Sequence, residues 1–417
     1  TSILAAAKLT GRTSNGLSVG ALLASTREET ADAFFTGSNS FERYAVEPRA
    51  TYGVARLQQD FNDGQSRFGG IVTGTRRALP ADGSFDHLPS EAYSVGADFE
   101  HSWSDREWAL WGYLSASRVA GDTTAMLNVQ QASNHYLQRP DLSWGELDRG
   151  ATSLAGADWR LQFERRVGQW TGAVWAAEIT SGFEANDLGF NTSSERLDGG
   201  FSVKYQEVVP NSLFRKSSVD FTTFHNFSHE VLRDAWSIGE WGDAHTAGTA
   251  RLNSSVEFLN FWTANIAVNW TPDLMSRRAT RGGPRMADPG SAGVTLGLGT
   301  DNRKLLFLRP RLSLDRGRDG SGNETTASVA MTIQPSTQLL LTLTPSYRRV
   351  TTGSQYVAAS DAVPYAPTYG TRYLFADLER RELSMVARAN WTFTPRLSLE
   401  LFAQPLVSSG DYVAYKQ

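Results

Sequence analysis

Long stretches of this chain alternate apolar and polar residues with a period of two, which restricts the fold more than any other feature of the sequence. Between Leu154 and Arg166, one face carries Ala155, Ala157, Trp159, Leu161 and Phe163, and the other carries Gly156, Asp158, Arg160, Gln162 and Glu164. The same alternation recurs at 93–103, 264–270, 306–315 and 397–404. A period of two is that of a β-strand, and no helical period fits these windows. We therefore expect long strands with one apolar face.

These strands are predicted to cross a membrane. The mean hydropathy is only −0.35, and no window approaches the roughly 20 consecutive apolar residues of a membrane-spanning helix. A barrel strand, however, shows lipid only every second residue, so its mean hydropathy stays low. Arg160 or Glu164 on a lipid-facing side would be costly, at roughly 2–4 kcal/mol for a mid-plane Arg or Lys. The pattern predicts an all-β, antiparallel transmembrane barrel of the bacterial outer membrane, with these charges facing the lumen.

Short and long connections alternate along the chain. The short turns are predicted at 14–16, 62–64, 104–105, 167–169, 210–211, 301–302, 335–336 and 394–395, several with the Asn-Gly or Asp-Gly chemistry of hairpins. The long polar segments are 27–47, 120–150, 181–195, 273–290 and 351–370. Outer-membrane barrels have short periplasmic turns and long extracellular loops. Pairing the two sets predicts roughly 18 strands, with the count least secure in 212–262 and 370–393.

Aromatic residues support the barrel over a soluble all-β fold. Six tryptophans lie within a few positions of a predicted turn, as an interfacial girdle requires: Trp103, Trp108, Trp170, Trp262, Trp270 and Trp391. The soluble alternatives are a propeller or a stacked sandwich. A propeller would show a blade repeat of ~40–50 residues, and none occurs.

Composition narrows the remaining classes. The net charge of −4 is small and evenly spread, which argues against nucleic acid as a partner. Cysteine is absent, which fits an oxidising periplasmic route. The chain begins at Thr1-Ser2 without an initiator Met or a signal sequence. We expect residues 1–417 to form a single barrel that is a fragment of a longer protein.

Charged residues on the predicted inner face are candidates for the lumen lining: Asp98, Glu100, Asp158, Arg160, Glu164, Arg309, Arg311 and Arg388. Such residues can form a selectivity lining, because rings of charge set the field inside a pore. Alternatively, mixed signs on neighbouring strands form ion pairs that stiffen the wall. The mixture favours the second interpretation and argues against strong ion selectivity.

Two loop motifs are candidates for binding. Asn186-Asp187-Leu188-Gly189-Phe190 and Arg281-Gly282-Gly283-Pro284 lie in expected extracellular loops, as does Arg139 with Asp141. The arginines Arg277, Arg278, Arg281 and Arg285 could meet lipopolysaccharide phosphate or an anionic solute. The alternative, which we favour, is that Gly and Pro shape loops that plug the mouth while Arg satisfies loop carbonyls.

The sequence gives little support for an enzyme. His225, His229, Asp220 and Asp243 form the only local cluster suited to acid–base chemistry, and no hydrolase or metalloprotease signature occurs. The His/Asp pairs are likewise a weak metal signal. We expect no catalytic residue, no metal and no cofactor.

Several segments resemble an uncharacterised bacterial family of outer-membrane barrels, a domain of unknown function. The matching stretches are 6–12 with Asn15-Gly16, 56–62, 138–141, 186–190, 281–284 and 390–410. Members of that family usually carry an N-terminal sandwich resembling family 9 carbohydrate-binding modules, which this chain lacks, and we suspect that the final strands are missing too. The resemblance implies a cell-surface protein linked to glycan handling, and it implies no catalytic residues.

Two functional hypotheses follow. The first is an outer-membrane channel or transport barrel that admits a solute related to oligosaccharides. The second is a plugged barrel that anchors a glycan-binding domain or partner proteins at the cell surface. The expected partners are membrane lipid and lipopolysaccharide, a glycan or small solute, and another outer-membrane or surface protein.

Overall fold

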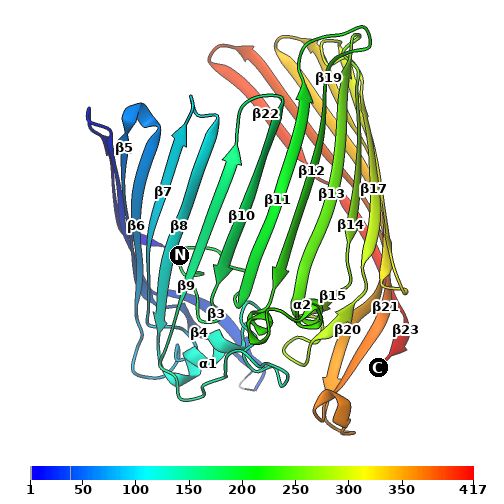
Figure 1. Cartoon of the computed structure of the whole chain (residues 1–417). Helices are drawn as coiled ribbons and strands as arrows, with labels where there is room; N and C mark the ends of the chain where they lie inside the picture. Colours follow the sequence, from blue (N-terminus) through cyan, green and yellow to red (C-terminus); the bar gives the residue numbers. More distant parts are fainter. Residues whose placement is uncertain (1, 38) are drawn as a thin grey trace.

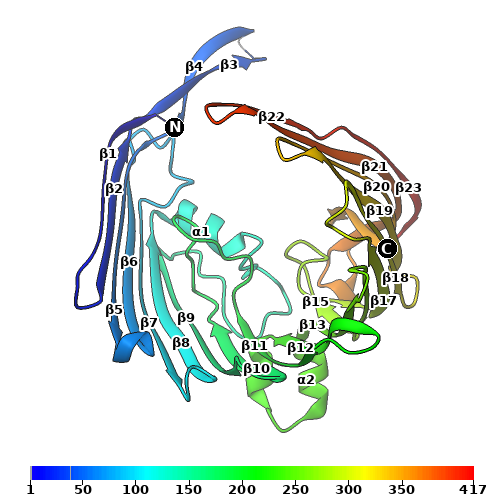
Figure 2. The ribbon, with the colours of Figure 1, turned by 90° about the horizontal axis from the view of Figure 1, so that it is seen from above.

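The main structure is one antiparallel sheet of 19 strands that curls into a barrel (Figures 1 and 2). The computed structural model describes residues 2–37 and 39–417; Thr1 and residue 38, which falls in the expected loop 27–47, lie outside the described residues. Each strand pairs with the next along the chain, except that β2 pairs with β5, β14 pairs with β17, and β23 pairs with β21 instead of β22. The strands are β1 (Ile3–Arg12), β2 (Leu17–Thr26), β5 (Arg49–Phe61), β6 (Ser66–Ala78), β7 (Glu91–Trp103), β8 (Trp108–Ala120), β9 (Ser153–Arg165), β10 (Trp170–Ile179), β11 (Arg196–Glu207), β12 (Phe214–Phe227), β13 (His245–Phe258), β14 (Thr263–Thr271), β17 (Ser291–Gly299), β18 (Leu306–Gly317), β19 (Gly322–Ser336), β20 (Leu339–Ser360), β21 (Arg372–Thr394), β22 (Leu397–Ala403) and β23 (Leu406–Lys416).

The predicted number of crossings is confirmed. β22 and β23 both pair with β21, β22 alongside 387–394 and β23 alongside 375–384. They therefore form one crossing of the membrane, which is interrupted at Gln404-Pro405. The 19 strands of the sheet thus make 18 crossings. The outer edges of β1 and of the β22–β23 crossing face each other across a gap in Figure 2, and no pairing joins them among the described residues.

The two ends of the barrel differ as predicted. Short turns lie at the upper end of Figure 1, and the long connections lie at the lower end. The long connections contain the hairpins β3 (Glu29–Phe35) with β4 (Ser40–Glu47) and β15 (Leu274–Ser276) with β16 (Met286–Asp288), and the helices α1 (Thr123–Gln131) and α2 (Ile238–Ala244). Single 3-10 turns form at Asn62–Gly64, His229–Arg233 and Ala366–Thr368. No helix in the described ranges is long and apolar enough to cross a membrane.

Three connections differ from the sequence-based expectation. Segments 79–90 and 228–244 are also long loops, and neither was predicted from the sequence. The expected loop 351–370 is mostly strand, because Ser360 pairs with Arg372 and only 361–371 connects β20 to β21. Its polar composition resembles a loop, but the hairpin projects beyond the rim, where neither face needs to be apolar (Figure 1).

The alternating faces appear in the wall as expected. In β9, Leu161 and Phe163 are exposed on the outer side, whereas Arg160 and Glu164 contact other polar or aromatic residues of the wall. Aromatic rings collect at the short-turn end, where Phe163 stacks on Trp103 and Trp108. Trp170, Trp262 and Trp391 also lie at that end, and Trp270 lies at the long-loop end. The outer surface is therefore an apolar band with an aromatic border on the periplasmic side.

Candidate lumen lining and extracellular loop cluster

Acid–base pairs line the inner face of β5–β9. The guanidinium of Arg56 donates to Asp98 across three strands at 2.9 Å. Arg166, just beyond β9, forms ion pairs with both Glu100 and Glu164. The pairs Arg56–Asp98 and Arg166–Glu100 join different segments of the wall and place opposite charges side by side on this part of the lumen.

Farther along the wall, an arginine is held between aromatic rings. The guanidinium carbon of Arg160 lies 5.5 Å from the ring centre of Trp111 and 5.2 Å from that of Trp175. Asp158 accepts a hydrogen bond from the Tyr113 hydroxyl at 3.3 Å. These inward aromatic residues were not predicted from the sequence, because tryptophan near a turn is typical of the lipid interface. Their register reveals them, since Trp111 and Trp175 both lie opposite the inward Gln162.

The inner face of β18–β22 is different, because three of its arginines form no ion pair among the described residues, although Arg348 of β20 pairs with Glu324 of β19. Arg309 and Arg388 lie over the rings of Phe307 and Phe402, at 4.9 and 5.2 Å. Arg311 lies opposite Ser328 on β19. Within the described residues, none of the three arginines forms an ion pair. Among the described residues, this arc of the lumen wall therefore carries three arginines without an ion-pair partner.

At the extracellular end, four loops pack into a structure that we call the loop cluster, made of segments 121–152, 180–195, 228–244 and 272–290. Its centre is Glu195, which is 2% exposed and forms an ion pair with Arg277. Arg277 also donates to the Glu195 carbonyl at 2.9 Å, and the His229 backbone N–H donates to the Glu195 carboxylate at 3.1 Å. Burial raises the pKa of Glu195, although Arg277 and Arg139 oppose that shift.

A second ion-pair group joins the same loops. Arg285 donates to Glu230 at 2.6 Å and to the Asp243 carbonyl at 3.0 Å. The Arg285 backbone N–H donates to Asp141 at 2.8 Å, and Asp141 lies 3.4 Å from the buried Arg139. Arg285 is thus brought to Arg139 and Asp141, although Asp141 lies 144 positions earlier in the sequence.

The Arg281-Gly282-Gly283 motif is packed between two neighbouring segments. A Cβ on Gly282 would lie 3.1 Å from Cδ of Gln138, and one on Gly283 would lie 2.6 Å from a ring carbon of Tyr373. Arg281 has a positive φ of 53° and lies over the Tyr356 ring at 4.5 Å. The two glycines permit this loop to pack closely against the segment that follows α1 and against the β20–β21 hairpin.

The Asn186–Phe190 motif closes its own turn. Asn186 accepts a hydrogen bond from the Asn191 backbone N–H at 2.6 Å, and Asp187 forms an ion pair with Arg77 of β6. The neighbouring Glu184 bonds to His135 at 2.8 Å. Burial would raise the pKa of Glu184, but hydrogen bonds from His135, Asn186 and Asn134 together lower it.

Helix α1 ties the loop cluster to the wall. Met126 packs on Ala92 and Val119, which lie opposite each other on β7 and β8. Figure 2 shows α1 inside the outline of the barrel. The helix begins after Asp122, whose side chain accepts from the Thr124 and Ala125 N–H groups. The loop cluster therefore covers part of the extracellular mouth.

The histidine cluster expected near Asp220 and Asp243 does not form. His225 bonds to His245 at 3.0 Å, whereas His229 bonds to Glu178 at 2.9 Å. Asp220 accepts from Asn253 in the wall. In the described part of the chain, no group of three or more His, Cys, Asp or Glu residues is arranged to hold a metal ion.

The curled antiparallel sheet, its exposed apolar outer face and its charged inner face define a transmembrane β-barrel of the bacterial outer membrane. Residues 1–79 and 114–417 match the family described as a domain of unknown function (DUF5916), and the chain belongs to that family. The comparison with curated proteins gives no match.

Two solved structures are similar at a low level. An anion-selective porin from Comamonas acidovorans is 11% identical over 80% of this chain and 89% of its own, with a TM-score of 0.34. The FrpB iron transporter from Neisseria meningitidis (F3-3 variant) is 10% identical over 97% of this chain and 79% of its own, with a TM-score of 0.37. Similarity of this degree gives no information on what this chain binds.

Proposed function

We propose that this barrel is an outer-membrane channel for anionic solutes, with an acidic oligosaccharide as the preferred class. The observation that carries the proposal is the group of un-neutralised arginines on one inner arc, Arg309, Arg311 and Arg388. Fixed positive charge in a lumen attracts anions and sets the field that selects them. The rings of Phe307 and Phe402 beside these arginines supply apolar surface for the C–H faces of a sugar.

The test is ion selectivity of the full-length protein in a planar bilayer under a KCl gradient. The wild type is expected to give a reversal potential that favours chloride. The triple variant R309Q/R311Q/R388Q is expected to shift that potential toward potassium selectivity. The control is R106Q, because Arg106 donates to the Asp63 carbonyl in a short turn, outside the lumen. Conductance with equal selectivity in the wild type and the triple variant would refute the role of these arginines.

A second candidate is a plugged barrel that anchors a glycan-binding domain or partner protein. Support for it comes from the loop cluster, in which buried ion pairs such as Arg277–Glu195 join loops across the mouth. A silent bilayer with verified insertion, combined with conductance in a variant lacking 272–290, would favour the plugged barrel. Conducting steps in the wild type that an acidic oligosaccharide blocks would favour the channel.

A further inference from the structure

On three strands of one arc, the outer apolar face ends in an arginine at the extracellular side. On β18 the outward positions run from Leu306 to Leu314 and then reach Arg316. On β20 they run from Leu339 to Tyr347 and then reach Arg349, and on β21 they run from Trp391 to Leu383 and then reach Arg381. The same placement recurs on the opposite arc, where Arg49 and Arg76 end the outer faces of β5 and β6.

The spacing places these arginines at the edge of the membrane. Leu306 and Arg316 are ten positions apart on one strand, as are Trp391 and Arg381. At a rise of ~3.3 Å per residue, ten positions span about 33 Å along the strand. A tilt of roughly 35–45° reduces this to about 25 Å, the height of the apolar band of such barrels. The arginine side chains therefore lie where lipid headgroups begin.

Two of these arginines lie directly opposite each other. Arg349 and Arg381 are cross-strand partners in the register of β20 and β21. Like charges in that position are destabilising unless a counter-ion joins them. The side chain of Arg381 has no hydrogen bond or ion pair among the described residues, and Glu379 is the carboxylate that pairs with Arg349, at 4.0 Å. Glu379 and its cross-strand partner Asp411 occupy the next row toward the extracellular end. The arginine pair therefore lies between this row and the apolar band.

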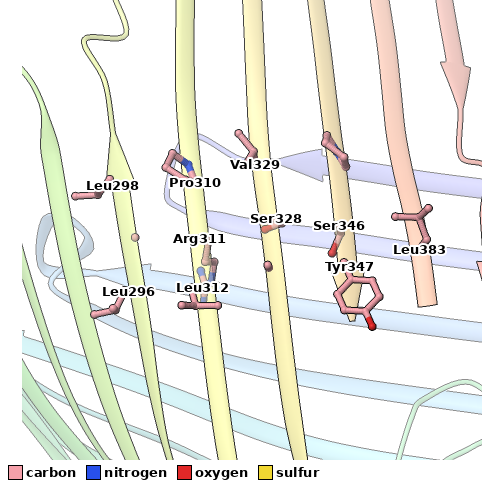
Figure 3. Close-up of a pocket in the computed structure, with 13 residues that line it drawn as sticks. Leu296, Leu298, Pro310, Arg311, Leu312, Ser328, Val329, Ser346, Tyr347 and Leu383 are labelled. Carbon is pink, nitrogen blue, oxygen red and sulfur yellow. The ribbon is translucent and has the colours of Figure 1, made fainter. Parts of the chain in front are cut away.

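An apolar groove begins immediately below this pair. It has a volume of about 460 Å³, and its residues include Leu296, Leu312, Tyr347 and Leu383 with Pro310 and Pro345. Figure 3 shows Leu296, Leu312, Tyr347 and Leu383 on neighbouring strands of the wall. Tyr347 lies two positions from Arg349 and Leu383 two positions from Arg381, on the same face and about 7 Å along each strand.

We propose that this arc binds a phosphorylated, acylated glycolipid of the outer leaflet, of the lipid A class. Its phosphate lies between Arg349 and Arg381, because guanidinium groups bind phosphate through paired, charge-assisted hydrogen bonds. One acyl chain occupies the groove between Leu312 and Leu383. The site needs both parts, so free phosphate and a dephosphorylated lipid each satisfy only half of it.

Native mass spectrometry of the full-length protein in detergent tests the proposal by titration with bisphosphorylated lipid A. The expected result is one tightly bound equivalent, with dephosphorylated lipid A and inorganic phosphate each binding much more weakly. The double variant R349Q/R381Q is expected to weaken binding of lipid A by at least about tenfold, because it removes charge-assisted hydrogen bonds. Equal binding of the phosphorylated and dephosphorylated lipids would overturn the proposal.

Two further variants make the result specific. R49Q/R76Q removes the same charge from the loop end of the outer face on the opposite arc, and this variant should still bind one equivalent of lipid A tightly. A327F places a ring in the groove from the lipid-facing side, and it should weaken lipid A binding without changing either arginine. Unchanged affinity in A327F, or an equal loss in R49Q/R76Q, would mean that the lipid is held by general charge and not by this site.

Discussion

Close backbone contacts between the wall and the loop cluster depend on single glycines. The clearest is Gly156 on β9, against which the backbone of Gly182 and Phe183 packs directly. A Cβ at Gly156 would lie 2.5 Å from the Gly182 carbonyl carbon and 2.6 Å from the Phe183 Cα. Neither atom can move without shifting the loop, since both belong to the main chain. The contact also explains why an inward-facing position of β9 carries no side chain.

The substitution G156A should therefore destabilise the protein. We expect a loss of about 1–3 kcal/mol in the free energy of unfolding, the usual cost of overpacking. Denaturant unfolding of the barrel in lipid vesicles measures this loss. The control is G20A, because a Cβ at Gly20 meets nothing within 4 Å. Equal stability of G156A and G20A would contradict the close contact.

At the scale of elements, the loop 180–195 is held by bonds to the wall as well as within itself. In segment 180–195, Gly189 donates to the Ala185 carbonyl at 2.7 Å, which closes the turn. The Glu184 backbone N–H donates to Ser117 of β8 at 2.9 Å, while its carboxylate bonds to His135 of the neighbouring loop. Glu184 therefore joins one strand and two loops.

The attachment through Glu184 should be sensitive to acid. Because the folded state lowers the pKa of Glu184, its contribution to stability is present above the ordinary value of 4.5 and is lost as the pH falls through the lowered folded value. E184Q should cost roughly 1–3 kcal/mol at pH 7 and should weaken the acid dependence. Denaturant midpoints at neutral and acidic pH test this. The control is E146Q, at an exposed position of the loop 121–152. If E184Q were as sensitive to acid as the wild type, Glu184 would not be the source of the acid dependence.

For the whole molecule, the unequal ends of the barrel fix its orientation. The short turns lie at one end, and the loop cluster with the projecting β20–β21 hairpin lies at the other (Figure 1). Outer-membrane barrels place their long loops outside the cell. The arginines proposed to bind lipid lie toward the loop end, where the outer leaflet carries its phosphorylated glycolipid.

Single cysteines can test this orientation, because residues 1–417 contain no cysteine. A362C lies in the connection between β20 and β21, and T337C lies in the short turn between β19 and β20. A membrane-impermeant maleimide should label A362C on intact cells and should label T337C only after the outer membrane is permeabilised. The reverse pattern would mean that the barrel is inserted the other way round.

The sequence by itself determined the strands, their faces, their approximate number and the two kinds of connection. The alternation of apolar and polar residues is a local property, because the residues of a single strand such as 153–165 form both its lipid-facing and its lumen-facing side. Hairpin chemistry such as Asn62-Asp63-Gly64 is local as well. The loops at 79–90 and 228–244 were missed because they carry no such periodic signal.

Only the tertiary structure decided which residues meet. Asp98 pairs with Arg56, 42 positions away, and Arg277 reaches Glu195, 82 positions away. The arginine pair of Arg349 and Arg381 and the groove beneath it depend on the register between strands, which side-chain periodicity alone does not specify. The loops likewise acquire their contacts only when the barrel brings their ends together, because their own sequences contain no apolar period that fixes a partner.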